Sequence, residues 1–568
     1  MPAIVIAVLV AVAFFLGYRF YSKYLAEKVY TLDKDFETPA HEFEDGVDYV
    51  PTNKHVLFGH HFTSVAGAAP IVGPAIAVFW GWVPALLWVV LGTIFAAGVH
   101  DFGALVVSVR NRAQNLGTLS ATVINARART LFLLIIFFLL TLVNAVFAVV
   151  IAILFESFPA SVIPIFFEIP MAIFIGQYIY RTRSSALVPS LIGVGLLYLS
   201  ILVGQAFPID LSPVASAIGL DARMLWIILL FAYTFIASRI PVWVLLQPRD
   251  YINSHQLFIA LGVIFLGVLV GFDRIVAPAV ASVPEGSPHW FPFLFITIAC
   301  GAISGFHALV SSGTTSKQLD NEEDARYVGY FGAVGEGSLA LGAILATTAG
   351  LGAYAVWQER YTDFDTASSG AVGNFVEGVG HFANNLGVPL GIGTIFAAVV
   401  VVSFAATTMD TGVRLQRYII QEIGEIVRFR LLARNLTLAA ALAVVIPLGL
   451  ALAPNLAFGR LWRLFGTTNQ LTAGLALAVV AVWVFTRNRN PLAQIIPLTF
   501  LLAMTTWALF IQLGDFFRAG DWLLVAIDGV IFVLALWLIV ESIGAFVRAR
   551  GERGMQTSEA SGNQEGER

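Results

Sequence analysis

The chain has 568 residues, of which 58% are hydrophobic and only 12% are charged. A soluble globular protein is roughly a quarter charged, so this chain has too little charge for a water-facing surface and is expected to lie in a membrane. The net charge of −4 says nothing about partners, and no basic patch is large enough to suggest nucleic acid. The single cysteine, Cys300, excludes an intrachain disulfide and a cysteine-cluster metal site.

The first apolar run follows Met1 directly and extends from Ala3 to Gly17, before the first basic residue, Arg19. A cleaved signal peptide would carry basic residues ahead of its apolar run, so we expect a first membrane span instead.

Apolar runs of roughly 20 residues recur along the chain, and each is long enough to cross a bilayer as a helix. The run at 131–155 carries no charge at all. We expect fifteen spans, at 2–21, 62–82, 84–109, 130–155, 162–180, 187–206, 223–246, 255–272, 291–313, 329–356, 388–409, 434–453, 468–486, 491–513 and 522–546.

The loops between these spans set an orientation, because basic residues favour the cytoplasmic side. With fifteen spans, the arginine-rich loops after 84–109, 162–180 and 388–409 fall on one side, which places the N-terminus outside and the C-terminus in the cytoplasm. Segment 357–387 is then the longest outside loop. Segment 411–429 has a basic and an apolar helical face, which suits either an interfacial helix or a cytosolic continuation of the preceding span.

Two prolines and two glycines interrupt the second expected span between Gly67 and Pro74. Such breakers free backbone N–H and C=O groups that could bind a ligand. The alternative is a kinked helix whose small residues allow close packing. The substrate-binding candidates in this region are His61, Ser64, Gly67, Ala68 and Gly73.

The expected span 291–313 carries a stripe of hydroxyl groups around one histidine, formed by Ser304, His307, Ser311 and Thr315. A lone histidine is often purely structural, but its hydroxyl neighbours favour a binding surface here. The candidates in this region are Ser304, His307, Ser311, Ser312, Gly313 and Thr314.

The expected span 388–409 ends in a third polar stripe that includes Ser403, Thr407 and Asp410. Hydroxyls and a carboxylate suit either Na⁺, held at Thr407 and Thr408, or a proton relay; the alternative is a membrane-edge ion pair between Asp410 and Arg414. Among isolated charges, Glu336 is a protonatable candidate with Arg239 as its expected partner, and Glu168 is expected to face the outside. The ion-coupling candidates are Asp410, Glu336, Ser403, Thr407, Thr408 and Asp101.

The first two regions share a spacing, from His61 to Gly67 and from His307 to Gly313, and their spans are expected to run in opposite directions. This pattern is typical of an inverted repeat with two broken helices. It divides the chain into a first span with a cytoplasmic loop (1–61), a first five-helix repeat (62–206), two spans with an outside loop (207–290), a second five-helix repeat (291–486), two C-terminal spans (487–548) and a disordered cytoplasmic tail (549–568).

The same segments resemble the carbon starvation protein A family from about residue 50 to about residue 490. The resemblance rests on 53–62, Gly67 to Pro74, His100-Asp101-Phe102, Gly301 to Thr315, Asp324-Ala325-Arg326 with Gly329-Tyr330, 407–411 and 464–470. The chain departs from the family in being shorter than its larger members and in Lys317-Gln318 after the second motif.

The resemblance implies an all-α polytopic membrane protein of the bacterial inner membrane, with the inverted five-helix repeat of the amino acid–polyamine–cation superfamily, a LeuT-like arrangement. It implies a transporter of pyruvate or short peptides linked to nutrient starvation, driven by proton symport, with neither enzymatic activity nor a cofactor. The hydroxyl-rich 311–315 is closer to pyruvate-type members. Sodium symport and a membrane nutrient sensor are the alternatives, and the oligomeric state stays open.

Overall fold

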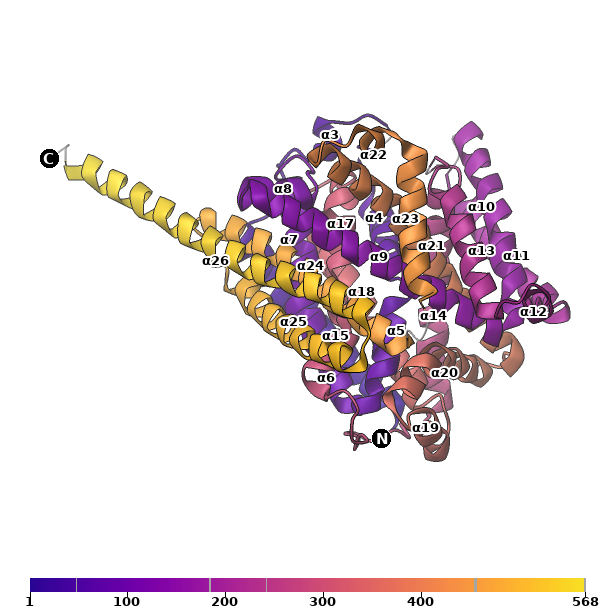
Figure 1. The fold of residues 1–568 in the computed structure, drawn as a ribbon. Helices are drawn as coiled ribbons and strands as arrows, with labels where there is room; N and C mark the ends of the chain where they lie inside the picture. The colour runs from indigo at the N-terminus through magenta and orange to yellow at the C-terminus, as the bar shows by residue number, and fades with distance from the viewer. Residues whose placement is uncertain (47, 183–184, 242, 454–456, 566–568) are drawn as a thin grey trace.

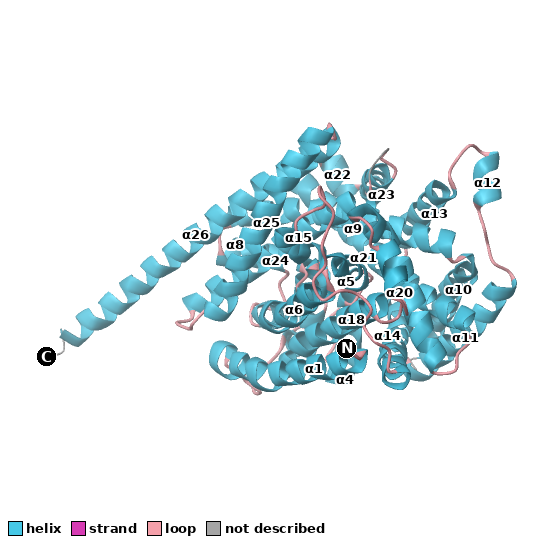
Figure 2. Cartoon of the chain, turned by 90° about the horizontal axis from the view of Figure 1, so that it is seen from below, coloured by secondary structure: helices cyan, strands magenta, loops and turns pink. Residues whose placement is uncertain are grey.

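The computed structural model describes residues 1–568 except 47, 183–184, 242, 454–456 and 566–568, and it describes only the backbone from residue 552 onward. The described chain is a bundle of helices without a β-strand (Figure 2). Its only extended pairings are two isolated bridges, between Pro2 and Arg274 and between Thr52 and Leu319.

The helices follow one another along the chain, as Figure 1 shows. The longer ones are α1 (Ala3–Leu16) with its continuation through η1 (Gly17–Tyr21), α2 (Ser22–Tyr24) and η2 (Leu25–Tyr30), α4 (Lys54–Val65), α5 (Ala69–Ala77), α6 (Trp82–Gly92), α7 (Gly98–Val109), α9 (Ala126–Ser157), α10 (Val162–Thr182), α11 (Leu187–Ala206), α13 (Ala222–Ala237), α14 (Leu246–Gly271), α18 (Phe331–Thr348), α20 (Phe364–Asn385), α21 (Leu390–Ile426), α23 (Leu436–Ala451), α24 (Phe458–Thr486), α25 (Leu492–Ala519) and α26 (Trp522–Glu565). The shorter ones are α3 (Pro39–Glu42), η3 (Val78–Trp80), η4 (Thr93–Ala97), α8 (Leu116–Val123), η5 (Pro159–Ser161), α12 (Ser212–Ala217), α15 (Trp290–Thr297), α16 (Ala299–Ala302), α17 (Gly305–Gly313), η6 (Thr315–Lys317), η7 (Arg326–Tyr330), α19 (Tyr354–Arg360) and α22 (Arg430–Arg434).

Eleven of the described helices are long and apolar enough to cross a membrane, or twelve when the bent pair 54–65 and 69–80 counts as one span. Each of the fifteen expected spans coincides with one of these helices, with the shorter apolar helices α13 or α23, or with the interrupted segment from α15 to α17. The all-α, multi-pass membrane architecture is therefore confirmed, whereas the count of fifteen stays a prediction.

Helices α9, α21 and α24 form the centre of the bundle. Of their most apolar stretches, 78%, 72% and 94% respectively are buried inside the protein, against 33% for the stretches that begin at Ala3 and at Trp522. Helix α24 carries the polar run Thr467–Gln470, which is fully buried. Hydrocarbon offers no hydrogen bonds, so a helix with such a run packs among other helices rather than against lipid.

The segment expected as the longest outside loop, 357–387, is mostly helical, and its place outside the membrane stays a prediction. Helix α20 spans 22 residues and is capped at its N-terminus by Asp363, whose side chain accepts a hydrogen bond from the Thr366 N–H. Its buried face consists of small and apolar residues spaced as on one side of a helix, while Gly, Ser, Asn and Glu elsewhere in the segment lower its overall hydropathy. A search for apolar runs therefore misses it.

The structure decides between the two interpretations of segment 411–429. Helix α21 runs without interruption to Ile426, so the segment continues the preceding span and is not a separate interfacial helix. Arg414 helps to hold the continued helix in place. It is buried and donates to the Ala237 carbonyl oxygen at 2.9 Å, which fixes this turn of α21 against the end of α13.

Disorder is expected for 549–568, whereas α26 continues to Glu565 and projects past the other helices (Figures 1 and 2). A helix that is already nucleated by a membrane span can extend one residue at a time without a new nucleation cost. The division into two five-helix repeats and terminal segments stays a prediction.

The two interrupted spans run antiparallel to each other. We call the end of the bundle where α1 begins the N-terminal face, and the end where η2 and α7 finish the opposite face. At the N-terminal face, the Trp80 indole N–H after α5 donates to the Pro288 carbonyl oxygen just before α15, at 2.9 Å. At the opposite face, Lys54 at the start of α4 lies 3.4 Å from Asp324, beyond α17. The breaks of both spans therefore meet near the middle of the bundle.

Candidate functional site

The central cavity lies where the two breaks meet. The first break separates α4 from α5 at 66–68, and the two helices bend by 51° across it. The second break lies at Ile303 and Ser304, between α16 and α17, where both residues are extended. The space between them is about 20 Å³ and is lined by Ser64, Val65, Gly67, Ala69, Val143, Phe147, Cys300, Ser304, Phe306, Thr408 and Phe465. A space of this size holds about one water molecule, so the cavity is closed in this conformation.

The second break is held open by Asn469 of α24. Its Oδ1 accepts from the Ser304 hydroxyl at 3.2 Å and from the Phe306 backbone N–H at 3.3 Å, and its Nδ2 lies 3.0 Å from Cys300 Sγ. The side chain therefore acts as an N-cap for α17 that comes from another helix. Helix α17 approaches α24 closely at Gly305, where a Cβ would lie 2.5 Å from the Asn469 carbonyl oxygen.

The first break packs against α21. A Cβ on Gly67 would lie 2.8 Å from Thr408 Oγ1, so only glycine lets the two backbones approach this closely. The Gly67 N–H donates to the Val65 carbonyl oxygen at 3.0 Å. With Gly67 and Phe306 N–H groups both engaged within the protein, a ligand would have to displace existing partners or move the helices to reach them.

A chain of buried titratable side chains lies beside the second break. His307, one turn after Ser304, places its Nδ1 2.9 Å from Asp101 Oδ2 and its Nε2 3.1 Å from Glu336 Oε1. His100 Nδ1 lies 2.6 Å from the other oxygen of Asp101. All four side chains are at most 1% exposed, so α7, α17 and α18 meet at a dry ionisable cluster. Three of the sequence candidates, Asp101, His307 and Glu336, are brought together here.

Both ring nitrogens of His307 face carboxylate oxygens, and a neutral imidazole donates from one nitrogen only. Either the ring is doubly protonated, or one of the two carboxylates carries a proton. Nδ1 is hydrogen-bonded to Asp101, whereas Nε2 and Glu336 Oε1 lie at ion-pair distance without the geometry of a hydrogen bond. Within the part of the chain that the structure describes, no three His, Cys, Asp or Glu side chains are arranged to hold a metal ion.

His61 connects the first interrupted span, to which it belongs, with the hydroxyl-rich stripe of the second. Its Nδ1 hydrogen-bonds Thr315 Oγ1, just beyond α17, at 2.9 Å. Its Nε2 is buried without a hydrogen-bond partner among the described residues, and its ring packs on Gly332 of α18, where a Cβ would lie 2.8 Å away. His61 thus borders the helix that carries Glu336 without touching its carboxylate.

A second buried charge cluster is centred on Arg249 of α14. Its guanidinium lies 3.3 Å from Glu168 of α10 and 2.8 Å from Asp410 of α21. The Tyr233 hydroxyl donates to Asp410 and the Ser403 hydroxyl donates to Glu168, at 2.8 and 2.9 Å. Two sequence-based expectations are wrong here: Asp410 pairs with Arg249 rather than with Arg414, and Glu168 is fully buried rather than outside.

The hydroxyl groups expected to hold Na⁺ are all engaged within the protein. Thr407 and Thr408 donate to carbonyl oxygens of their own helix, at Ser403 and Phe404, and Ser403 donates to Glu168. The nearest carboxylate on the same stripe, Asp410, already faces a permanently charged guanidinium. Thr408 alone of these hydroxyls lines the central cavity.

Several other candidates lie away from the cavity. Gly73 is a packing position, since a Cβ there would lie 2.4 Å from the Thr297 carbonyl oxygen. Ser312 bonds the Ala308 carbonyl and the Leu116 N–H, and exposed Thr314 bonds the Val310 carbonyl. Gly313 ends α17, Ser311 is buried with no hydrogen-bond partner among the described residues, and Ala68 is buried in the first break.

Glu336 does not have the partner expected from the sequence. Arg239 lies in the turn after α13, is exposed, and stacks over the Phe235 ring with 5.4 Å between the guanidinium carbon and the ring centroid. Helix α13 ends at Ala237, so residue 239 never reaches the depth of Glu336.

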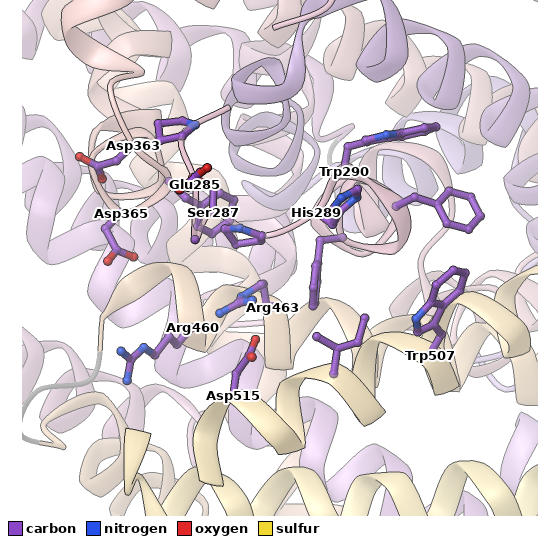
Figure 3. A pocket seen from close by; sticks show the side chains of 17 residues that line it. Glu285, Ser287, His289, Trp290, Asp363, Asp365, Arg460, Arg463, Trp507 and Asp515 are labelled. Carbon is purple, nitrogen blue, oxygen red and sulfur yellow. The ribbon is translucent and has the colours of Figure 1, made fainter. Parts of the chain in front are cut away.

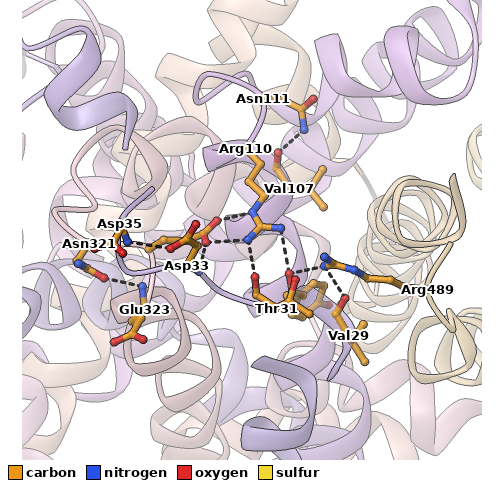
Figure 4. Close-up of polar contacts among 12 residues, drawn as sticks. Val29, Thr31, Asp33, Asp35, Val107, Arg110, Asn111, Asn321, Glu323 and Arg489 are labelled. Atoms are coloured by element: carbon orange, nitrogen blue, oxygen red, sulfur yellow. Dashed lines mark hydrogen bonds and ion pairs between the residues drawn. The ribbon is translucent and has the colours of Figure 1, made fainter. Parts of the chain in front are cut away.

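The opposite face is closed by a network around Glu322 (Figure 4). Arg110, after α7, donates twice to its carboxylate, at 2.5 and 2.8 Å, and also to the Tyr30 and Thr31 carbonyl oxygens. Arg489, after α24, donates to the Val29 and Tyr30 carbonyls. Four segments far apart in the sequence are thus tied together across this face.

The sequence pattern alone missed three of these contributors. Asn469 belongs to a motif of the family resemblance, but only the fold places it against the second break. Tyr233 was assigned to the middle of the span 223–246, and Arg249 to the loop after it. The signal that could have identified Arg249 is an arginine next to a long apolar run, which in a membrane requires an acidic partner.

Comparison with known proteins identifies relatives along the whole chain. The model of the carbon starvation protein CstA family matches residues 2–358 and 358–508. The chain is 34% identical to the peptide transporter CstA of Mycobacterium tuberculosis, over 89% of this chain and 74% of that protein. It is 32% identical to the pyruvate/proton symporter BtsT of Escherichia coli, over 88% and 80%.

Similar solved structures include a manganese transporter of Eremococcus coleocola, with a TM-score of 0.39 and 12% identity over 86% of this chain and 94% of that one. Another is MhsT in complex with L-phenylalanine, with a TM-score of 0.43 and 11% identity over 87% and 99%.

Proposed function

The chain belongs to the carbon starvation protein CstA family, and on that premise we propose that it imports a small carboxylate-bearing nutrient together with protons. The nutrient is pyruvate or a short peptide, the substrates named for its relatives. The protein would work as a multi-pass transporter in the bacterial inner membrane.

The observation that carries proton coupling is the contact of His307 with two buried carboxylates. With Asp101 and Glu336 ionised and His307 doubly protonated, the cluster has a net charge of −1. A buried substrate carboxylate would add a second negative charge, and an uncompensated buried charge costs several kcal/mol. Uptake of one further proton, on Glu336, offsets it. Substrate and proton would therefore enter together.

The substrate would bind in the central cavity, with its carboxylate toward the start of α17. A helix N-terminus carries a partial positive charge that favours an anion, and the carboxylate would take the Phe306 N–H from Asn469. Ser304, Gly67, Ser64 and Thr408 line this space. His307 lies one turn further along α17, so a carboxylate bound at Ser304 would affect the protonation of the cluster directly.

The orientation follows from the basic residues. Arg110 and Arg489 lie at the opposite face, and the positive-inside tendency makes that face cytoplasmic. The N-terminus would then lie outside. In this conformation the Glu322 network closes the cytoplasmic side and the central cavity is collapsed, which corresponds to an occluded state between loading and release.

A proton is favoured over sodium as the coupling ion because Arg249 supplies a fixed positive charge beside Asp410. Transport is favoured over catalysis because the polar groups lie along helices at membrane depth. A sensor role would lead to binding without accumulation.

The test is uptake of labelled pyruvate and of a dipeptide into proteoliposomes, under an imposed pH gradient or an imposed Na⁺ gradient. We expect the pH gradient alone to drive accumulation. Glu336→Gln, which mimics a permanently protonated side chain, is expected to abolish gradient-driven accumulation while substrate exchange across the membrane continues.

Asp410→Asn is the matched control, since it also neutralises a buried carboxylate, but one that faces Arg249. We expect it to lower the thermal midpoint, because it breaks a buried ion pair, and the folded protein to retain accumulation driven by the pH gradient. Loss of coupling in Asp410→Asn with normal coupling in Glu336→Gln would move the proton site to the second cluster. Accumulation driven by Na⁺ alone would refute proton symport.

A further inference from the structure

A second cavity opens at the N-terminal face and lies apart from the central site (Figure 3). Its volume is about 1180 Å³, and it is formed by the loop before α15, the start of α20, the first turns of α24 and the second half of α25. Its lining is Pro284, Glu285, Gly286, Ser287, Pro288, His289, Trp290, Phe291, Phe293, Asp363, Phe364, Asp365, Arg460, Arg463, Trp507, Ile511 and Asp515.

Arg463 of α24 is the unusual residue in this cavity. Only 7% of it is exposed, its Nε has no hydrogen-bond partner, and no ion pair joins it to a carboxylate of the described residues. Its guanidinium carbon lies 5.0 Å from the centre of the Phe293 ring and 5.7 Å from that of Phe364. A buried guanidinium is normally paired, because removing its charge from water is costly. A missing anionic partner explains the arrangement.

The neighbouring charges do not supply that partner. Arg460, one turn earlier on α24, is paired with Asp521. Asp515 is paired with exposed Arg518 at 2.8 Å. Asp528 of α26 is a fully buried carboxylate with neither oxygen hydrogen-bonded, but it forms no ion pair within 4.0 Å. Arg463 therefore retains donors directed to the cavity.

The cavity has a charged end and an aromatic end (Figure 3). Near Arg463, the exposed carboxylates of Glu285 and Asp365 line the wall without an ion pair among the described residues. Trp290 and Trp507 stand at the other end. The charged end thus offers a guanidinium and two unpaired carboxylates, and the aromatic end offers a flat apolar surface.

We propose that this cavity is an entrance site that binds a zwitterionic short peptide through its free C-terminal carboxylate. Arg463 holds the carboxylate with the paired donors of its guanidinium, Glu285 or Asp365 holds the N-terminal ammonium, and the aromatic end holds an apolar side chain. The volume suits a di- or tripeptide and far exceeds what pyruvate would fill. The inference rests on the proposed transport function and selects peptides within it.

The experiment measures binding to the purified full-length protein by calorimetry, using Ala-Phe, its C-terminal amide, its N-acetyl derivative and pyruvate. We expect Ala-Phe to bind, and both the amide and the N-acetyl derivative to bind at least about tenfold more weakly, since each removes one charged contact. Pyruvate, which lacks an ammonium and a side chain, is expected to bind weakly. Equal affinity for Ala-Phe and its amide would overturn the proposal without any variant.

Arg463→Gln is expected to weaken Ala-Phe binding by at least about tenfold. Arg463→Lys is expected to weaken it less, because lysine keeps the positive charge but lacks the paired N–H donors of the guanidinium. Arg460→Gln is the matched control, from the same cavity and helix, and is expected to bind within about twofold of the unmodified protein. If Arg463 served only to balance Asp528, the double variant Arg463→Gln with Asp528→Asn would restore binding, and that result would overturn the proposal.

Failure of this inference is distinguishable from failure of the transport function. Proton-driven uptake together with Ala-Phe binding that is unchanged in Arg463→Gln would refute the entrance site alone. Ala-Phe binding that is weakened in Arg463→Gln, with no proton-driven uptake by the unmodified protein, would refute the transport mechanism and leave the entrance site standing.

Discussion

Replacing Asn469 with alanine is expected to disturb the second helix break while leaving the bundle folded. The substitution removes the acceptor for the Ser304 hydroxyl and the Phe306 N–H, and the donor to Cys300 Sγ. The hydroxyl can rotate to another acceptor and sulfur is a weak one, so the main loss is the buried N–H of Phe306. Leaving such a group unpaired costs about 1–3 kcal/mol.

That free energy acts on the break itself, because these hydrogen bonds exist only when α17 begins at Gly305. A shift of about 1–3 kcal/mol corresponds to a change of roughly 5- to 150-fold in the population of the competent conformation. The assay is the concentration dependence of proton-driven uptake in proteoliposomes, with the thermal midpoint of the purified protein measured alongside. We expect the apparent KM of Asn469→Ala to rise within that range.

Asn144→Ala is the matched control. Asn144 is also fully buried, and its Nδ2 donates across to the Gln416 side-chain oxygen at 2.8 Å between α9 and α21, but it does not line the central cavity. It is expected to lower the thermal midpoint with little effect on KM. If both variants changed KM equally, or if neither did, the capping role of Asn469 would be refuted.

Three further predictions follow from single contacts. In Gly305→Ala the new Cβ would lie 2.4 Å from the Thr472 Cβ, so we expect at least about 1–3 kcal/mol of destabilisation, seen as a lower thermal midpoint in detergent. Glu322→Gln weakens the bonds from Arg110 and should speed alkylation of the lone Cys300 by an impermeant thiol reagent from that side by about tenfold or more; an unchanged rate would contradict closure by this network. Hydrogen bonds from Thr366 lower the pKa of Asp363, so its capping of α20 stabilises the protein at neutral pH and is lost as pH falls through that lowered value. Asp363→Ala should remove about 1 kcal/mol at neutral pH and flatten the acid limb of the pH–stability profile.

The membrane fold and both breaks could be predicted from the sequence because they depend on local properties. Apolar length predicts spans, and the clustering of Gly67, Pro70, Gly73 and Pro74 predicts an interruption whatever surrounds it. The same reasoning missed α20, because a buried helix that need not span hydrocarbon can keep a polar composition.

The partners of the polar residues could not be predicted, because they are set by packing between distant segments. His307 and Glu336 were recognised separately as candidates, but their contact depends on how α17 lies against α18. Asp410 and Arg414 share a helical face four residues apart, yet Asp410 pairs with Arg249, some 160 positions away, since that residue enters from α14. Spacing along one helix indicates which residues can meet, and tertiary packing decides which do.

The two buried clusters differ in the one property that proton coupling requires. Around Arg249 the charges are fixed, because a guanidinium keeps its proton and its two carboxylates are each held by a hydroxyl donor as well, from Tyr233 and Ser403. Breaking such a buried pair costs about 3–5 kcal/mol, so this cluster holds four helices together. Around His307 the proton can lie on the ring or on a carboxylate with little movement of atoms. A transporter that couples to protons needs a site that changes its charge within a fold that does not come apart, and these two clusters divide those tasks between them.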